Sequence, residues 1–450
     1  MASGDPGHGA SSSPGGFEAQ RDAVHWFRAA APYINAHRGK TAVVYMAGEA
    51  VADAARLPQL IADIAVLHTL GLRVVLIHGS RPQIDQGLQR GGLAPRYHRG
   101  MRITDPGDLP VVMAAISAVR THVESLLSMG LPGTPMAGSR LRVSSGNFVM
   151  ARPFGIHDGV DFGLTGAVRK VDAPAIDALL ALGHLVLLPN IGYSATGDAF
   201  NLESESVACS AAISLGADKL IMLVEEDDSA LPRQLSLDEA EAWLGAQQID
   251  EGIGSHVRRA VQACRAGVAR VHLIRRVEEG GLLRELFTRD GTGVLVTRET
   301  YEGLRRARSE DVGGVLELIT PLEASGALVR RSREQLETEI DRFWVIERDG
   351  LVIACAALYP HPDAGMGELA CLAVHEGYRG GRRGELLLGA LEREARRQGL
   401  THIFVLTTQT AHWFLERGFR RADRSALPSS RRELYNLRRN SLVFMKPLGE

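Results

Sequence analysis

The chain has 450 residues, of which 45% are hydrophobic and 23% charged, and its net charge is −2. This composition excludes wholesale disorder, and the length predicts two or three domains, because single domains hold about 150 residues. Without a basic excess, we expect neither nucleic acid nor a membrane as a partner. The four cysteines are far apart and form no CxxC pair, which is typical of reduced thiols in a cytoplasmic protein.

Residues 1–19 are rich in Gly, Ser and Pro at their start and lack the apolar core of a secretory signal, so we predict a disordered tail there. From Val24 onward, apolar residues recur at helical spacing. Short apolar runs then alternate with helical patterns, and the runs cover 42–46, 72–77, 184–188, 220–224 and 271–274. This alternation predicts an α/β fold over residues 20–297, with a mostly parallel sheet sandwiched by helices.

The loops after these runs are the expected ligand sites, because open α/β sheets bind ligands at the carboxyl ends of their strands. They read Ala-Gly-Glu at 47–49, His-Gly-Ser-Arg-Pro at 78–82 and Pro-Asn-Ile-Gly at 189–192. This order resembles the amino acid kinase family, most closely its acetylglutamate kinase branch. A working kinase needs a lysine in the first loop, which has none, and Pro82 removes an N–H from the second. The resemblance therefore implies a kinase-like fold that is catalytically silent.

A change in composition after Gly293 marks a second unit. We predict a linker at 298–310 and an α+β domain at 311–450. The expected helices cover 312–317, 332–339, 384–397 and 411–417, and the expected strands cover 343–347, 351–359, 368–374, 403–406 and 441–445.

The strongest local signal is an apolar strand at 368–374 that leads into the loop Arg-Gly-Gly-Arg-Arg-Gly at 379–384 and then into an amphipathic helix. A helix N-terminus with flanking arginines fits a pyrophosphate. From the loop alone, a solvent-exposed turn whose charges add solubility is equally acceptable. The segment resembles motif A of the GNAT acetyltransferases, which holds acetyl-CoA, although Arg382 stands where glycine is expected.

The GNAT resemblance implies that acetyl-CoA lies along the strand and the loop, with the N–H of Leu372 or Ala373 facing the thioester oxygen. The implied coenzyme contacts are Cys371, Leu372, Ala373, Val374, Arg379, Gly380, Gly381, Arg382, Arg383, Gly384 and Glu385.

The order of a silent kinase-like domain followed by a GNAT domain resembles the bacterial N-acetylglutamate synthase family. The segments that carry this resemblance are 26–35, 78–85, 285–293, 412–419 and 434–436. It implies acetyl transfer from acetyl-CoA to the α-amine of L-glutamate, the first step of L-arginine biosynthesis, without a metal.

The resemblance also implies catalytic residues. The amine must lose a proton before it attacks the thioester, and Glu368 is the expected general base. Without the resemblance, Glu368 reads as a surface glutamate at a strand end. A hydroxyl is expected to protonate the leaving thiolate, with Thr407 preferred for its place after a strand and Thr408 and Tyr435 as alternatives. The thiolate can also leave unprotonated.

Glutamate has two carboxylates, and each is best bound by a cationic, preferably bidentate partner. The family pattern points to Arg330 and Arg439, with Ser441 and the backbone of Leu328 beside them. For any single arginine, an ordinary surface charge is the usual alternative.

Arginine-regulated relatives bind their end product near the last strands of the kinase-like domain and an N-terminal helix. Carried over, Glu285 and the backbone of Gly291 and Gly293 would meet L-arginine, bordered by His272 and Tyr33. Glu285 as a plain helix-surface carboxylate is the alternative. The resemblance implies feedback inhibition by L-arginine and a homo-oligomer, expected to be a hexamer.

Three other functions stay open from the sequence. A bifunctional synthase and kinase is disfavoured by the missing lysine. A non-enzymatic arginine sensor is disfavoured by Glu368 and the arginine-rich loop. An acetyltransferase for protein lysines or drugs is disfavoured by paired arginines suited to a dicarboxylate.

Overall fold

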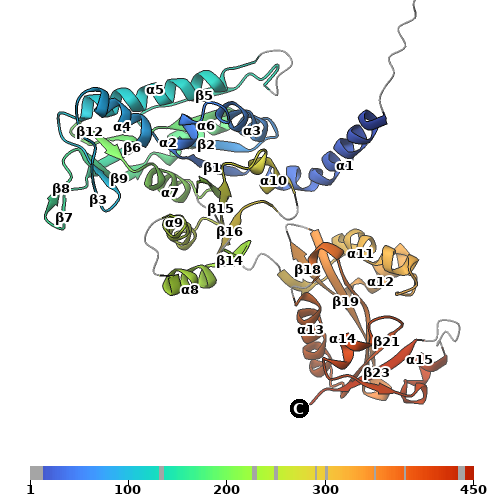
Figure 1. Ribbon diagram of the computed structural model, residues 1–450. Coiled ribbons are helices and arrows are strands. Elements are labelled where there is room, and N and C mark those ends of the chain that lie inside the picture. The colour runs from blue at the N-terminus through green and yellow to red at the C-terminus, as the bar shows by residue number, and fades with distance from the viewer. Residues whose placement is uncertain are drawn as a thin grey trace, which may run out of the picture. The chain divides into compact units, whose positions relative to one another are not determined.

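The computed structural model divides into two compact units, Met1–Glu299 and Thr300–Glu450 (Figure 1). The structure describes residues 14–130, 136–225, 231–247, 252–288, 291–298, 303–348, 351–379, 382–433 and 441–449. The tail predicted at 1–19 lies largely outside these residues, and helix α1 (Pro14–His37) begins inside it. Among the described residues, no helix combines the length and apolar character that a membrane span requires.

The first unit is built on a sheet with the strand order β14-β16-β15-β13-β1-β2-β10-β5. Its neighbouring strands are parallel except for β15 and β16. The strands are β1 Thr41–Met46, β2 Arg73–His78, β5 Arg142–Ser144, β10 His184–Leu188, β13 Lys219–Val224, β14 Gln234–Ser236, β15 Arg270–Arg275 and β16 Val294–Thr297. The predicted mostly parallel sheet is therefore confirmed, and the five predicted apolar runs form β1, β2, β10, β13 and β15.

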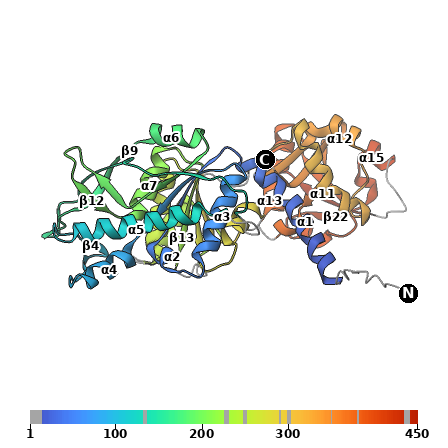
Figure 2. The same ribbon diagram turned by 90° about the horizontal axis from the view of Figure 1, so that it is seen from above.

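Helices cover both faces of this sheet (Figures 1 and 2). They are α2 Gly48–Ala52, α3 Leu57–Thr69, α4 Arg81–Arg90, α5 Leu109–Leu127, α6 Ala173–Ala181, α7 Ser204–Ser214, α8 Leu237–Gln247, α9 Ile253–Arg265 and α10 Gly281–Phe287. In β1, Val43 and Tyr45 pack against one hydrophobic cluster, and Val44 and Met46 pack against another on the opposite face. This burial on two faces explains why the strand is a continuous apolar run.

Beside the main sheet, the first unit contains a small closed barrel with the order β11-β12-β9-β6 and two short hairpins. The barrel strands are β6 Val149–Pro153, β9 Thr165–Val171, β11 Ile191–Tyr193 and β12 Ala199–Leu202, and the hairpins are β3 Arg96–His98 with β4 Met101–Ile103 and β7 Ile156–His157 with β8 Val160–Asp161. The sequence analysis did not predict these strands, because they are short and only partly buried.

The second unit has one sheet with the order β17-β18-β19-β20-β21-β23-β22, in which β20 and β21 form the parallel pair. Its strands are β17 Gly303–Arg306, β18 Phe343–Arg348, β19 Leu351–His361, β20 Met366–Val374, β21 His402–Thr407, β22 Arg420–Ala422 and β23 Leu442–Pro447, and its helices are α11 Val312–Ala324, α12 Arg333–Glu339, α13 Arg383–Arg397, α14 Ala411–Leu415 and α15 Ser429–Glu433. Strand β17 pairs with β18, so residues 303–306 belong to this sheet although the predicted linker spans them.

Two irregularities of strand β20 shape the second unit. First, β20 pairs with β21 only from Met366 to Leu369, and beyond Leu369 the two strands separate. Second, the register against β19 shifts between Cys355 and Ala357, so that Cys371 and Leu372 together face one residue of β19. Cys371 has a φ of 52°, which places it in the left-handed region that one type of β-bulge uses at its first residue. Both irregularities interrupt backbone pairing at the same place.

Candidate active site

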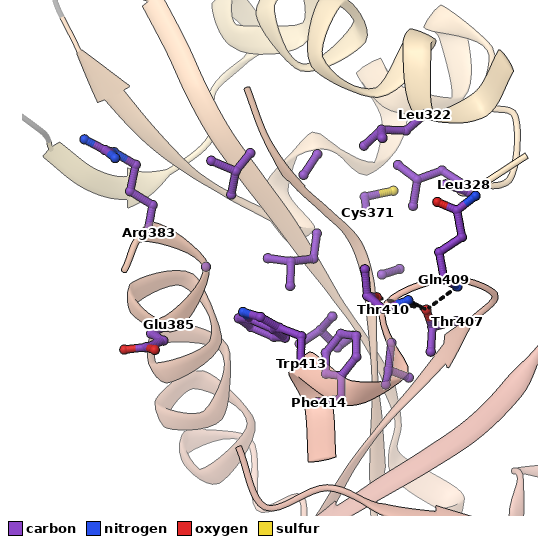
Figure 3. A pocket seen from close by; sticks show the side chains of 18 of the residues that line it. Leu322, Leu328, Cys371, Arg383, Glu385, Thr407, Gln409, Thr410, Trp413 and Phe414 are labelled. Carbon is purple, nitrogen blue, oxygen red and sulfur yellow. Dashed lines mark hydrogen bonds between the residues drawn. The ribbon is translucent and has the colours of Figure 1, made fainter. Parts of the chain in front are cut away.

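A cavity of about 610 Å³ lies where β20 and β21 separate (Figure 3). It is lined by residues of both strands, of α11 and the segment after it, of the start of α13 and of α14. They are Leu322, Ala327, Leu328, Leu369, Ala370, Cys371, Leu372, Ala373, Val374, Tyr378, Arg379, Arg382, Arg383, Gly384, Glu385, Val405, Leu406, Thr407, Gln409, Thr410, Trp413, Phe414 and Arg417. Of the predicted coenzyme contacts, those in the described residues therefore line one cavity. Gly380 and Gly381 lie outside the described residues.

The β-bulge forms part of the cavity wall. Figure 3 shows Cys371 on the side of the cavity that Leu322 and Leu328 line. Burial raises the pKa of the Cys371 thiol to about 11, so the sulfur stays protonated and unreactive near neutral pH. A bulge leaves ladder amides unpaired, and such amides are suited to hydrogen bonding with a bound thioester.

The start of α13 carries the arginine-rich end of the cavity. Arg382 precedes the helix with a φ of 57°, which costs a residue with a Cβ about 1–2 kcal/mol. Its Nε donates to Glu385 Oε2 at 2.8 Å, and Arg417 Nη2 donates to Oε1 at 2.7 Å. These hydrogen bonds lower the pKa of Glu385. The first turn of the helix points its N–H groups outward, which favours an anionic ligand here.

Arg383 is held differently from Arg382. Its Nη1 donates to the carbonyl of Tyr378 at 2.7 Å, and the guanidinium lies over the Tyr378 ring with 5.4 Å between Cζ and the ring centroid. The Arg382 side chain is 84% exposed and its guanidinium pairs with a carboxylate. Arg383 is therefore the more firmly placed of the two cations.

Thr407 lies at the end of β21 and lines the cavity. Its Oγ1 accepts hydrogen bonds from the backbone N–H groups of Gln409 at 3.3 Å and Thr410 at 3.1 Å, and it lies 2.9 Å from Thr410 Oγ1 (Figure 3). The hydroxyl thus stabilises the turn between β21 and α14. With its oxygen accepting from two amides, the hydroxyl proton is left as the donor to a neighbour.

Glu368 lies in β20 and is 9% exposed. It pairs across the ladder with Tyr359, and directly paired residues share a sheet face. Tyr359 packs against the cluster that contains Cys371, so Glu368 lies on the face that bears the thiol. Arg431 of α15 donates from Nε to Glu368 Oε2 at 2.6 Å and from Nη2 to Oε1 at 3.0 Å. The sequence analysis missed this partner, since no motif marks Arg431.

The arginines expected to bind the acceptor differ in burial. Arg330 is exposed, whereas its neighbour Arg331 is half-buried, and Arg331 Nε is buried with no hydrogen-bond partner among the described residues. The charge of Arg331 acts on the Cys371 thiol, opposing the rise in the pKa that burial causes. Neither arginine is among the residues that line the cavity, and Arg331 Nη1 donates to the Val329 carbonyl at 3.2 Å. The sequence analysis did not distinguish the burial of the two arginines, because adjacent residues of the same type carry no pattern that separates them.

Two of the remaining acceptor residues lie at or beside the cavity. Leu328 lines the cavity, and Ser441 is buried immediately before β23, whose Leu442 pairs with Thr407. Arg439 and Tyr435 lie outside the described residues.

In the first unit, the residues expected around L-arginine gather beside α10. His272 Nδ1 donates to Glu285 Oε1 at 2.7 Å, and the amides of Thr292 and Gly293 donate to Oε2 at 2.6 and 2.8 Å. Burial alone would raise the pKa of Glu285, but these hydrogen bonds outweigh it and lower the pKa to about 2. Gly291, with a φ of 59°, approaches so closely that a Cβ would lie 2.5 Å from Oε2.

Glu285 is therefore not a plain surface carboxylate, because its side chain is only 5% exposed. Tyr33 lies on α1 and packs against the hydrophobic cluster that contains Leu286 of α10, and His37 Nε2 donates to the Leu286 carbonyl at 2.9 Å. These contacts tie α1 to the helix that bears Glu285.

The loops that suggested a kinase border a second cavity, of about 450 Å³, at the carboxyl ends of the sheet strands. The lining contains the carboxylates of Glu49, Glu203, Glu205 and Glu225, and among the described residues it contains no lysine. The lining also contains Arg81 and Arg102, so four carboxylates face two guanidinium groups. The cavity therefore lacks the lysine and the cationic excess that would stabilise a transferred phosphoryl group. Among the described residues, no group of His, Cys, Asp or Glu is arranged to hold a metal ion.

Comparisons with known proteins agree with this geometry. Residues 40–275 match the model of the amino acid kinase family, and residues 315–419 match that of the acetyltransferase (GNAT) family. The amino-acid acetyltransferase of Pseudomonas putida is 52% identical over 432 residues, which cover 95% of this chain and 100% of that protein. That of Pseudomonas syringae pv. tomato is 51% identical over 431 residues, covering 94% and 99%.

Solved structures give the same result. The N-acetylglutamate synthase of Neisseria gonorrhoeae, complexed with coenzyme A and L-arginine, is 37% identical with a TM-score of 0.83, and the match covers 95% of this chain and 99% of that chain. The complex of a synthase from the same organism with coenzyme A and N-acetyl-glutamate is 38% identical with a TM-score of 0.58 and the same coverage.

Proposed function

This chain belongs to the amino-acid acetyltransferase family, and we propose that it transfers the acetyl group of acetyl-CoA to the α-amine of L-glutamate. The observation that carries the proposal is the cavity at the separation of β20 and β21, where a β-bulge at Cys371 lies opposite an arginine-rich helix start. Similarity to a synthase complexed with coenzyme A and N-acetyl-glutamate supports the choice of both substrates. The product would feed L-arginine biosynthesis.

The coenzyme would lie along the cavity wall. Its pyrophosphate would bind at the start of α13, where helix amides and Arg383 are available. The amides of its pantetheine arm would pair with the backbone of β20 that β21 leaves free, as an added strand does. The thioester oxygen would then accept from the N–H of Leu372 or Ala373, which stabilises the charge that develops during attack.

The reaction needs one proton acceptor and one leaving thiolate. The ammonium group of glutamate would give a proton to the Glu368 carboxylate, and the neutral amine would form a bond to the thioester carbonyl carbon. The carbon–sulfur bond breaks, and the electron pair leaves with the CoA sulfur. The nitrogen then loses its second proton to become the amide nitrogen. That proton would be transferred to the CoA thiolate, either directly or through the hydroxyl of Thr407.

Thr407 fits the role of the thiolate's hydrogen-bond donor because it lines the cavity and its oxygen already accepts from two amides. For the acceptor carboxylates, burial favours Arg331 over the expected Arg330. Ser441 and the backbone of Leu328 are proposed contacts, and Arg439 remains a prediction.

L-Arginine is proposed as the feedback inhibitor, since the related synthase was crystallised with it. Its site would lie beside Glu285, His272 and the backbone of Gly291 and Gly293, with Tyr33 at its border. The Glu285 carboxylate is already charged and held by two amides, so it would offer a guanidinium a fixed anion. We assign this regulatory role to the domain at 20–297 and catalysis to residues 311–450.

A homo-oligomer, expected to be a hexamer in the cytoplasm, is part of the proposal. Helix α1 leaves Val24, Trp26 and Phe27 at least 44% exposed. An apolar surface of this kind on one helix is typical of an interface between subunits.

The test uses the purified chain with acetyl-CoA and L-glutamate, and free thiol is measured with and without L-arginine. Thiol release that requires glutamate, is lost in Glu368→Gln and falls with arginine is expected. If the chain binds coenzyme A but releases no thiol that depends on glutamate, the proposed acetyl transfer is contradicted and a non-enzymatic arginine sensor is favoured. If the rate of thiol release does not change in millimolar arginine, the proposed inhibition is contradicted while the acetyl transfer stands. ATP-dependent consumption of N-acetylglutamate would instead favour residual kinase activity.

A further inference from the structure

The ion pair between Arg431 and Glu368 carries a consequence for acceptor choice. Arg431 occupies both oxygens of the carboxylate that is proposed as the general base, with hydrogen bonds of 2.6 and 3.0 Å. A guanidinium in this two-point contact competes with the proton that the base must accept. In this resting arrangement, Arg431 therefore holds the Glu368 carboxylate and hinders it from accepting a proton.

Among the described residues, Arg431 is the partner whose side chain hydrogen-bonds to the Glu368 carboxylate. His361 Nε2 lies 3.9 Å from Glu368 Oε2, which is beyond hydrogen-bond distance, and His361 Nδ1 lies 3.2 Å from Ser430 Oγ. The Glu368 side chain is 11% exposed and that of Arg431 is 21% exposed. Within the part of the chain that the structure describes, the position of the Arg431 guanidinium thus decides whether the carboxylate is engaged.

Arg431 stands on an element that is lightly attached to the sheet. Helix α15 has only five residues, Ser429–Glu433, and none of them is buried. Among the described residues, its side-chain hydrogen bonds to the sheet are those of Ser430 with His361 and of Arg431 with Glu368. A guanidinium on such a short helix can turn from one carboxylate to another at small cost in packing.

We propose that Arg431 selects acidic acceptors by exchanging carboxylates: the side-chain carboxylate of the acceptor takes over the guanidinium, and Glu368 is thereby released to accept the ammonium proton. An acceptor with a neutral side chain offers the guanidinium no equivalent partner, so the base stays engaged. This inference rests on the proposed acetyl transfer, and it makes Arg431 a specificity-determining residue of that reaction.

The test compares L-glutamate with L-glutamine, which differ in the charge that the exchange requires. In Arg431→Gln, kcat/KM for glutamate should fall about 10- to 100-fold, as expected for a lost charged hydrogen bond, while kcat/KM for glutamine should stay or rise. The ratio of kcat/KM for glutamate to kcat/KM for glutamine should therefore fall by at least the same factor. Arg431→Lys keeps the charge without the two-point contact, and its ratio should lie between those of Arg431→Gln and the natural protein.

Arg432 provides the matched control, because it is exposed on the same short helix and its guanidinium donates to the Ser425 carbonyl at 3.5 Å, away from Glu368. Arg432→Gln should keep the natural ratio. Coenzyme A affinity, measured by titration calorimetry, should stay unchanged in all three variants, which verifies that they fold. An equal loss of turnover on both acceptors, or an unchanged ratio in both Arg431 variants, would overturn the exchange. If the natural protein releases no thiol with glutamate, the proposed function has failed instead.

Discussion

Gly384 of α13 meets the indole ring of Trp413 of α14 so closely that a Cβ at position 384 would lie 2.9 Å from Trp413 Cζ2. The glycine therefore brings the two helices together at the arginine-rich end of the cavity, which both residues line. Arg417 also packs against the indole ring, with its Cζ 4.1 Å from the ring centroid.

Gly384→Ala should weaken coenzyme A binding about tenfold. Overpacking of this kind costs about 1–3 kcal/mol, and relief would require Trp413 or the start of α13 to move. Gly389→Ala in the same helix is the control, because its Cβ would meet only Arg393 Nη1 at 3.5 Å. That variant should gain about 0.5–1 kcal/mol of stability and bind normally. Calorimetric titration measures the coenzyme A affinity of both variants. Equal affinities of the two variants would contradict the packing argument.

Arg331→Gln should raise the KM for L-glutamate about 10- to 100-fold with little change in the KM for acetyl-CoA, since a half-buried cation with an unpartnered Nε is replaced by a neutral amide. Arg330→Gln should change either KM less than about twofold, as exposed charges usually do. Initial rates at varied glutamate check both variants. If Arg330→Gln raises the KM for glutamate more than Arg331→Gln does, Arg330 is the residue that binds the glutamate carboxylate.

Acid should destabilise the chain through Glu285. The pKa of Glu285 is about 2 in the folded protein, below the ordinary value of 4.5. The unfolded chain therefore takes up the proton first, so the stabilisation is complete above pH 4.5 and is lost as the pH falls toward 2. Urea unfolding should lose about 2 kcal/mol from this group by pH 3.

Glu285→Gln is the comparison for the acid effect, because it keeps His272 and removes the titrating group. Its unfolding free energy should fall less between pH 6 and pH 3 than that of the natural protein. Parallel pH profiles would show that the carboxylate is not held as the hydrogen bonds indicate. The same variant should also lose sensitivity to L-arginine.

Arg305→Gln should lower the free energy of unfolding of the second unit by about 2 kcal/mol. Arg305 donates to both oxygens of Asp311 at 2.7 and 2.8 Å and to Glu347, and the Asp311 side chain is only 9% exposed. The substitution removes the guanidinium partner of that buried carboxylate and leaves it the N–H of Arg308, which donates to Oδ2 at 2.7 Å. Arg333→Gln, in an exposed pair with Glu337, should cost less than about 0.5 kcal/mol. Calorimetric melting compares the melting temperatures of the two variants. Equal shifts would show that the contacts of β17 do not contribute to the cooperative unfolding of the second unit.

Much of the fold could be predicted because its signals are local. The continuous apolar runs at β1, β2 and β13 come from strands buried on both faces, and the strand, glycine-rich loop and amphipathic helix around Arg379 to Glu385 follow one another directly. The barrel strands escaped prediction because three to seven residues of mixed burial give no clear period.

The order of residues alone determined the two families, the missing kinase lysine and the segment proposed to bind the coenzyme, since each depends on neighbours in the chain. Only the tertiary structure decided that Arg331 rather than Arg330 is half-buried, that β17 joins the second sheet and that Arg431, 63 residues away, engages Glu368. Burial and ion pairing between distant segments depend on how strands and helices pack, and a one-dimensional pattern does not contain those distances.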